Sequence, residues 1–180
     1  MDFYKHGSLI EECRNGSSKA QFRLYDQYSM AMYNLAYRMM NNREDAEDIL
    51  QEAFVDCFSN IATFRFESTF GAWLKRIVVN KCINQLRKKK IDITFYETLP
   101  PVAAEENEEP EWDTGEIFRS IEKLPDGYRI ILTLYLLEGY DHVEIGQILG
   151  ISESTSKSQY SRAKEKLKSL LSKKQIHGQS

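Results

Sequence analysis

The chain has 180 residues, of which 42% are hydrophobic and 28% are charged, and its formal net charge is −3. This balance is typical of a globular protein and excludes a collagen, a coiled-coil rod and a wholly disordered chain. No apolar run approaches the ~20 residues of a membrane-spanning helix, and residues 1–6 lack a secretory signal pattern. We therefore expect a cytoplasmic protein with no membrane insertion of its own.

Charge is distributed in three blocks along the chain. Residues 1–90 carry 14 basic and 11 acidic residues, 91–118 carry nine acidic and no basic ones, and 119–180 carry 10 basic and seven acidic ones. Within the last block, residues 154–174 hold seven basic residues and one acidic residue. Such a separation of charge indicates polyanionic partners and does not by itself specify a fold.

Few residues in the sequence suggest catalysis or metal binding. Cys13, Cys57 and Cys82 are odd in number and widely spaced, which favours reduced thiols over a disulfide framework. Three scattered histidines provide no closely spaced ligand set, so we expect no metal site and no cofactor. A Ser-His-Asp set and a phosphate loop are both lacking, so no catalytic residues are expected.

The first half of the chain has three helical patterns. The first pattern is an amphipathic stripe: Tyr25, Tyr28, Met32, Leu35 and Met39. The second begins after Asn42 as N-cap, and one of its faces is acidic and polar: Asp45, Asp48, Gln51 and Glu52. The third starts near Phe70, and a stripe beside its apolar face joins one aromatic, two amides and two guanidinium groups: Trp73, Arg76, Asn80, Asn84 and Arg87.

The polar stripe of the third helix and the acidic face of the second helix each allow two interpretations. Aromatic rings stack on unpaired bases, amides read base edges, and guanidinium groups hold phosphates, so the third helix could bind nucleic acid. The alternative is that Trp73 only lies at the margin of the core. For the acidic face of the second helix, the alternative is an ordinary solvated surface.

An acidic segment separates this half from the next. It contains three of the four prolines and no apolar periodicity, so we interpret it as a flexible linker, with a solvated loop of no further role as the alternative. The expected fold is therefore all-α. It consists of two small helical domains, at 1–90 and 116–180, joined by an acidic linker at 91–115.

The C-terminal segment predicts a helix-turn-helix. Asp141 and Glu144 form a capping box for a short helix, Gly150 follows in a tight turn, and Ser152 can cap the last helix. The outer face of that last helix is predicted to carry Lys157, Ser158, Ser161, Arg162 and Lys168. A basic outer face favours a DNA-binding unit over an ordinary αα-hairpin.

Two sets of motifs now resemble a known family. NREDAEDILQEAF (42–54), FR (64–65) and FGAWLKRI (70–77) resemble domain 2 of bacterial sigma factors of the extracytoplasmic-function group, in the sigma-70 family. LP (124–125), LEGY (137–140), EI (144–145), ILGIS (148–152) and SRAK (161–164) resemble domain 4 of the same group. The resemblance covers about residues 20–90 and 116–172, in the family's order.

The resemblance implies a promoter-specificity subunit that binds core RNA polymerase and recognises promoter DNA, both double-stranded and melted. Partners in this family can include an anti-sigma factor. Polymerase contacts would come from Asp45, Asp48, Gln51 and Glu52. Capture and melting of the minus-ten element would use Phe64, Ser68, Trp73, Asn80 and Asn84, with Lys75, Arg76, Arg87 and Lys88 on the DNA backbone. The minus-thirty-five element would be read by Lys157, Ser158, Ser161 and Arg162, with Lys164 on phosphate.

The sequence departs from the family pattern at four positions of the helix-turn-helix. Gln159 and Ser161 replace residues that are commonly basic or bulky, so the upstream promoter sequence does not follow from that of relatives. Gly146 stands where alanine is usual, at a cost of up to ~1 kcal/mol in helix propensity. Ser156 replaces an aliphatic residue on the buried side of the last helix, which predicts looser packing.

The sequence leaves two other functions to consider. One is a classical transcription regulator in which residues 1–90 sense a ligand or dimerise, and the other is an enzyme. The stripe from Trp73 to Arg87 argues against the regulator because a sensor domain would not need it.

Overall fold

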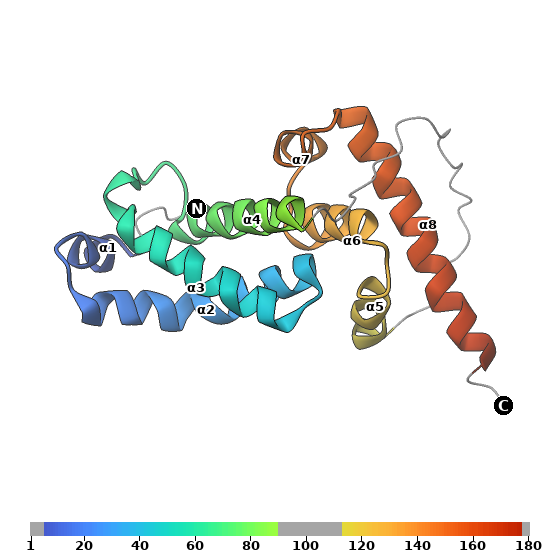
Figure 1. Cartoon of the computed structure of the whole chain (residues 1–180), viewed down its shortest axis with the longest axis horizontal. Coiled ribbons are helices and arrows are strands. Elements are labelled where there is room, and N and C mark those ends of the chain that lie inside the picture. Colours follow the sequence, from blue (N-terminus) through green and yellow to red (C-terminus); the bar gives the residue numbers. More distant parts are fainter. Residues whose placement is uncertain (1–5, 90–112, 178–180) are drawn as a thin grey trace. The chain divides into compact units, whose positions relative to one another are not determined.

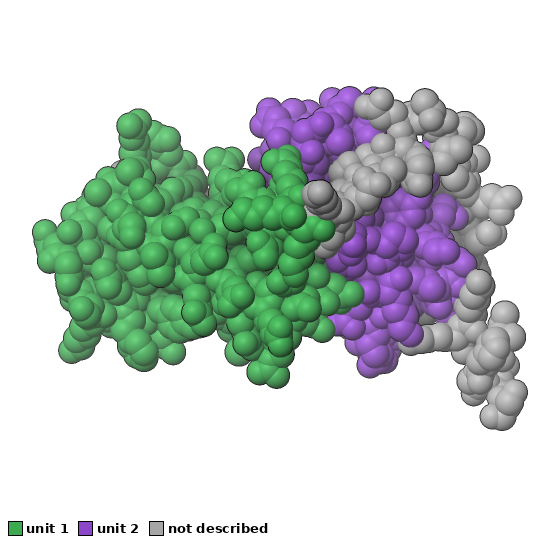
Figure 2. Space-filling view, in the orientation of Figure 1, with its two compact units in different colours: residues 1–90 green, residues 91–180 purple. Residues whose placement is uncertain are grey.

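The computed structural model describes residues 6–89 and 113–177, with side chains up to Ser172. Within these residues the regular elements are all helical, so the predicted all-α fold is confirmed (Figure 1). The chain divides into two compact units, residues 1–90 and 91–180 (Figure 2). Most of the acidic segment predicted as a linker lies outside the described residues. None of the described helices combines the length and the apolar character needed to span a bilayer.

Unit 1 contains four α-helices and one 3₁₀ turn. These are α1 (Gly7–Arg14), α2 (Ser18–Met40), α3 (Arg43–Ser59), η1 (Ile61–Thr63) and α4 (Phe70–Lys88). Ser17, Asn42 and Thr69 each accept a hydrogen bond from a backbone N–H in the first turn of the helix that follows. The predicted cap at Asn42 is confirmed, and these caps explain why the helices begin at these residues.

The core of unit 1 forms where α2, α3 and α4 pack against one another. Leu35 of α2, Ala53 of α3 and Leu74 of α4 are completely buried. Burial of a leucine side chain stabilises a fold by about 1.5–3 kcal/mol relative to its exposure, so this core sets the orientation of all three helices. Their remaining faces are the surfaces available for partners.

Unit 2 is built around one long helix. Its elements are α5 (Thr114–Ile121), α6 (Asp126–Leu132), the π-helical segment η2 (Thr133–Leu137), α7 (His142–Leu149) and α8 (Glu153–His177). Helices α5, α6 and α7 all contact α8 (Figure 1). Its apolar core is formed by Ile121, Leu124, Leu132, Ala163, Leu167 and Leu171.

The predicted helix-turn-helix is present in α7 and α8. Both hydrogen bonds of the capping box between Asp141 and Glu144 are formed. Gly150 ends α7 with a φ of 74°, a left-handed conformation that favours glycine. The Ser152 hydroxyl accepts a hydrogen bond from the Thr155 backbone N–H at 3.0 Å, so the predicted cap of the last helix is also confirmed.

Gly146 has a tertiary reason to be glycine. A Cβ atom at this position would lie 2.8 Å from the carbonyl oxygen of Ile151 in the turn. The backbone of Ile151 also donates its N–H to the Gly146 carbonyl at 3.0 Å, which fixes this close approach. The loss in helix propensity expected from the sequence is therefore accompanied by closer packing of the turn on α7.

Gly146→Ala is expected to destabilise unit 2 by about 1–3 kcal/mol, because the turn must move to admit the methyl group. Hydrogen exchange of the full chain, read by mass spectrometry, should show faster exchange in α7 and α8 than in the wild type. Gly7→Ala is the matched control, because a Cβ atom there meets nothing within 4 Å. Unchanged protection of α7 in Gly146→Ala would contradict the steric argument.

Candidate polymerase and nucleic-acid interfaces

The acidic face of α3 is built by the same helical periodicity that places its apolar face in the core. Asp48, Gln51 and Glu52 are exposed, whereas Asp45 is half-buried. All four predicted polymerase-binding residues therefore lie on the surface of unit 1, although they are not equally accessible.

Two lysines, Lys81 of α4 and Lys89 directly after it, pair with acidic residues of α3, which the sequence did not predict. The Lys89 ammonium lies 2.6 Å from a carboxylate oxygen of Asp45. Lys81 lies 3.2 Å from Glu52 and 2.7 Å from Asp56. The pairs join helices that are distant in sequence, so no local pattern could reveal them. Such surface pairs contribute about 0–1 kcal/mol each, so a basic partner could compete for these carboxylates.

A pocket of about 550 Å³ lies between the loop at residues 64–69, here called the capture loop, and the start of α4. Its walls include Phe64, Arg65, Ser68, Trp73 and Arg76. The structure thus brings four predicted minus-ten residues together around one hollow: Phe64, Ser68, Trp73 and Arg76. Aromatic, hydroxyl and guanidinium groups in one pocket can stack on a nucleobase, bond its edge and neutralise its phosphate.

The aromatic residues of the pocket differ in exposure. The Trp73 ring is half-buried and lies 5.3 Å, between centroids, from the ring of Phe64. Phe64 itself is only 2% exposed and also packs against Phe70. The ring of Phe64, one of the residues expected to take part in capture and melting, therefore fills the core beneath the loop and exposes little surface to a base.

The polar stripe of α4 continues away from the pocket. Arg76, Asn80, Asn84 and Arg87 are all exposed at spacings of four, four and three residues. Asn80 and Asn84 do not line the pocket, so the structure places them along the track and not around the hollow. Lys88 is exposed as well, while Lys75 is half-buried and lies outside the pocket.

The exposed face of α8 contains fewer of the predicted DNA contacts than expected. Lys157 and Lys164 are exposed, and Ser158 and Ser161 are half-buried. Lys157 lies 2.6 Å from Glu153, one turn away, and Lys164 lies over the Tyr160 ring, 5.0 Å from its centroid. All four residues remain on the side of α8 that a DNA groove could reach.

The predicted exposure of Arg162 is wrong. Its residue is only 9% exposed, so in this structure its guanidinium group is not presented to a base edge. Helical periodicity puts Arg162 next to Ser158 and Ser161, but the residue is buried in the folded chain. Arginine can bury its long stem, and a positive charge in the sequence therefore does not establish an exposed side chain.

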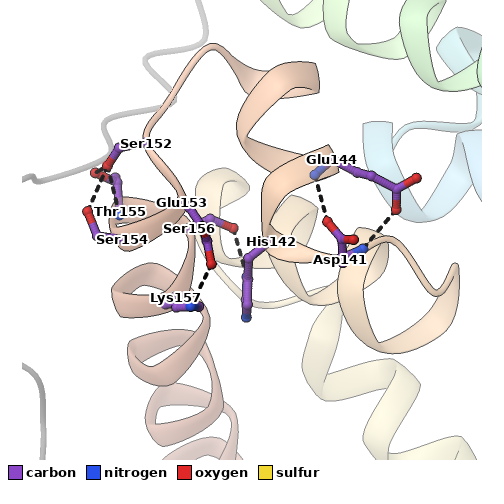
Figure 3. Close-up of polar contacts among 9 residues, drawn as sticks. All are labelled: Asp141, His142, Glu144, Ser152, Glu153, Ser154, Thr155, Ser156 and Lys157. Atoms are coloured by element: carbon purple, nitrogen blue, oxygen red, sulfur yellow. Dashed lines mark hydrogen bonds and ion pairs between the residues drawn. The ribbon is translucent and has the colours of Figure 1, made fainter.

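Ser154 is a candidate that the sequence reasoning missed. It is exposed in the first turn of α8, and its hydroxyl lies 2.9 Å from the hydroxyl of Ser152 (Figure 3). Its spacing of three and seven residues from Lys157 and Ser161 puts it on their face of the helix. That spacing was the signal available in the sequence.

A polar and aromatic cluster connects α7 to α8. The Nδ1 atom of His142 lies 2.9 Å from the hydroxyl of Ser156, which is fully buried (Figure 3). The His142 ring also stacks on Tyr135, with centroids 4.4 Å apart and planes 16° apart. Ser156, expected to loosen the packing, thus provides a specific polar contact between the two helices of the helix-turn-helix.

The three cysteines are buried, free thiols. Burial raises the pKa of Cys57 and of Cys82 to about 12, so their reactive thiolate forms are scarce at neutral pH. Among residues 6–89 and 113–172, the acidic, histidine and cysteine side chains form no group suited to hold a metal ion.

Comparison with known families agrees with both units. Residues 24–91 match the Sigma-70 region 2 family, and residues 114–167 match the Sigma-70 region 4 family. The sigma factor SigW of Bacillus subtilis, of the extracytoplasmic-function group, is 34% identical to this chain, and the alignment covers 90% of the chain and 94% of SigW. This chain belongs to that group of the sigma-70 family. It is therefore a promoter-specificity subunit of RNA polymerase that acts in transcription initiation.

Other relatives extend the comparison. The sigma-E factor of Escherichia coli K12 is 31% identical over 87% of this sigma factor and 89% of the relative. The sigma factor RpoE of Bartonella quintana, solved with the anti-sigma factor NepR, shares the fold with a TM-score of 0.57. It is 22% identical, and the match covers 83% of this chain and 95% of that one. CnrH, solved with the cytosolic domain of CnrY, gives a TM-score of 0.56 at 22% identity and covers 91% of this chain and 95% of CnrH.

The stability of unit 2 is expected to depend on the charge of His142. Partial burial, and then the nearby Lys157 ammonium, lower the pKa of His142 below its ordinary value of 6.5, although Glu153 and Asp141 act in the opposite direction. The unfolded chain therefore binds a proton first as pH falls below about 6.5, and stability is lost over that range. Residue-resolved NMR of the full chain should give His142 a lower titration midpoint in native buffer than in urea.

His142→Gln is expected to flatten the loss of α7 and α8 protection between pH 7 and pH 5.5, measured by hydrogen exchange. His6→Gln, in unit 1, is the control and should leave that loss unchanged in unit 2. A native midpoint for His142 at or above the value in urea would contradict the prediction.

Proposed function

We propose that this sigma factor uses three separate surfaces: the acidic face of α3 for core polymerase, the pocket and stripe of α4 for the melted minus-ten element, and the outer face of α8 for the minus-thirty-five element. The observation that carries the proposal is the continuity of α4. An aromatic-lined pocket at its start leads into an exposed track of amides and guanidinium groups.

The polymerase surface depends on how its acidic residues are held. Asp48 and Gln51 are exposed, whereas Asp45 pairs with Lys89, directly after α4, and Glu52 pairs with Lys81 of α4. We assign the primary contact to Asp48 and Gln51. Asp45 and Glu52 would support it by exchanging their lysine partners for basic groups of the polymerase. Complementary charge of this kind governs mainly the association rate and the register of binding.

The minus-ten surface combines a receptor for one base with a track for the strand. An extruded base would enter beside Trp73, with Ser68 at its edge and Phe64 as the inner wall. Extrusion of a base costs a few kcal/mol, and stacking returns about 1–3 kcal/mol per base. Asn80 and Asn84 would read bases farther along, and the cationic residues would hold the backbone: Lys75, Arg76, Arg87 and Lys88.

The minus-thirty-five surface would be the face of α8 that enters the major groove. Lys157 and Ser161 are the central candidates, with Ser154 and Ser158 beside them and Lys164 on phosphate. Arg162, which is buried, would help to hold α8 in position instead of contacting a base. Base contacts of this kind carry sequence preference, while phosphate contacts set orientation.

This function assigns no reaction to the chain itself, so we infer a non-enzymatic subunit that acts in the cytoplasm, where bacterial promoters and polymerase are found. An anti-sigma factor is a further expected partner. The Bartonella quintana sigma factor of the same fold was solved with such a partner, which supports this expectation.

Asp48→Lys combined with Gln51→Lys is expected to weaken binding to core polymerase by at least about tenfold at low salt, because it reverses charge at the centre of the acidic face. Affinity should be measured with labelled full-length protein and purified core enzyme over a range of salt concentrations. The difference in affinity between the variant and the wild type should become smaller as the salt concentration rises, since salt screens exposed charges.

The matched control is Asp26→Lys combined with Asn34→Lys, which makes the same charge change at exposed positions of α2. This variant should bind core polymerase like the wild type at each salt concentration. Equal affinities for wild type and the α3 variant would remove the acidic face from the interface.

Trp73→Ala is expected to slow promoter opening by about 5- to 150-fold, which corresponds to the loss of one stacked base. Opening should be followed with reconstituted holoenzyme on a duplex promoter that the wild-type holoenzyme selects from a DNA library. Binding to core polymerase should stay unchanged, and a pre-melted bubble should partly restore activity.

Phe22→Ala is the control for loss of an aromatic ring, because Phe22 is 68% exposed and lies on α2, away from the pocket. It should open the promoter at the wild-type rate. Wild-type opening by Trp73→Ala would mean that the pocket does not receive a base.

A further inference from the structure

Helix α1 contacts the capture loop through one side chain. Arg14, the last residue of α1, donates from Nε to the carbonyl oxygen of Ile61 at 3.4 Å, and its Nη2 atom donates to the carbonyl oxygen of Phe64. Both carbonyls belong to the segment that enters the capture loop, at the start of η1 and directly after it. One guanidinium group therefore bridges two backbone positions that are 47 and 50 residues away in sequence.

The same guanidinium group also contacts an aromatic ring within the loop. Its central carbon lies 5.4 Å from the centroid of the Phe66 ring. Phe66 has a φ of 57°, a left-handed conformation that is an outlier for a bulky side chain. The ring of Phe66 lies 4.8 Å from that of Phe64, so the strained residue is packed between Arg14 and the wall of the pocket. Strained backbone persists only where its surroundings over-determine it.

Helix α1 is itself held firmly enough to act as an anchor. Leu9, Ile10 and Cys13 of this short helix are buried, and Ile10 is completely buried. The Arg14 side chain is only 24% exposed and is also paired with Glu11. A half-buried guanidinium group with four contacts has little freedom to leave the loop. Helix α1 also precedes the residues that match the region 2 family.

We propose that Arg14 is a positioning residue for base capture: it fixes residues 61–66 in the shape that forms the pocket wall at Phe64, opposite Trp73. The inference rests on the proposed role of the pocket in receiving an extruded base. It adds that the N-terminal helix, which does not line the pocket, sets how well that pocket is formed before DNA arrives.

The chemistry of the contact makes the choice of residue testable. A guanidinium group has donors in a rigid planar fork that can meet two carbonyls and also lie against a ring. A lysine ammonium at the same position keeps the charge but cannot match this geometry. Arg14→Lys therefore separates the positioning role from the net charge of unit 1.

Arg14→Lys is expected to slow opening of a duplex promoter by about 10- to 150-fold, the loss expected for one hydrogen bond to a charged group. Affinity for core polymerase should equal that of the wild type. A promoter library should show relaxed base preference at the captured position and unchanged preference in the minus-thirty-five element. Hydrogen exchange should be faster at residues 61–69 and unchanged in α2 and α3. Arg23→Lys, at an exposed position of α2, is the matched control and should show none of these changes.

The possible outcomes test the role of Arg14 separately from the proposed function of the pocket, on which that role rests. If Trp73→Ala slows opening while Arg14→Lys opens at the wild-type rate with wild-type base preference, the pocket captures a base and Arg14 does not position it. If Trp73→Ala has no effect, the proposed function of the pocket fails first. If Arg14→Lys loses affinity for core polymerase and exchanges faster throughout unit 1, Arg14 is a general stabiliser and the positioning role is rejected.

Discussion

Burial of one face of α4 against α2 and α3 is the constraint on which the rest of unit 1 depends. Leu74, Val78 and Leu86 are buried along that face, and this fixes the rotation of the helix about its axis. With the rotation fixed, Arg76, Asn80 and Asn84 must point outward in one line. Packing of the apolar side chains on one face of α4 thus determines the geometry of the polar residues on its other face. The acidic face of α3 is fixed in the same way, and it reaches Lys81 of α4 and Lys89 directly after it because the two helices pack together.

In unit 2 the constraint is different, because the short helix α7 must hold the long helix α8 in place within the helix-turn-helix. The close approach of the turn at Gly146 and the contact between His142 and Ser156 both connect α7 to its neighbours. Buried polar contacts of this kind add direction to apolar packing, because a hydrogen bond is satisfied only in a narrow range of geometries. Gly146 and Ser156 depart from the family pattern, and both therefore make contacts that help to position α8.

The capture loop lies between η1 and α4 and is itself irregular. Backbone carbonyls outside regular structure need partners, and Arg14, 50 residues away in sequence, donates to the carbonyl of Phe64 at the start of the loop. If the pocket receives a base as proposed, its function would depend on α1, which precedes the residues that match the region 2 family. The proposed minus-ten surface would then be assembled from three parts of unit 1: α4, the loop before it and the end of α1.

The sequence by itself determined the features that depend on neighbours within one or two turns. The caps at Asn42 and Ser152, the capping box at Asp141 and the outward stripe of α4 follow from local hydrogen bonds and from a period of 3.6 residues. Only the tertiary structure decided which side chains a neighbouring element covers. Two of these features are the burial of Phe64 and of Arg162, which depends on how the elements pack. The others are the pairing of Lys89 with Asp45 and the contacts of Arg14 with residues 61–66, which join residues far apart in sequence. Periodicity specifies which residues share a face of a helix, but the packing of the other helices decides which part of that face remains exposed.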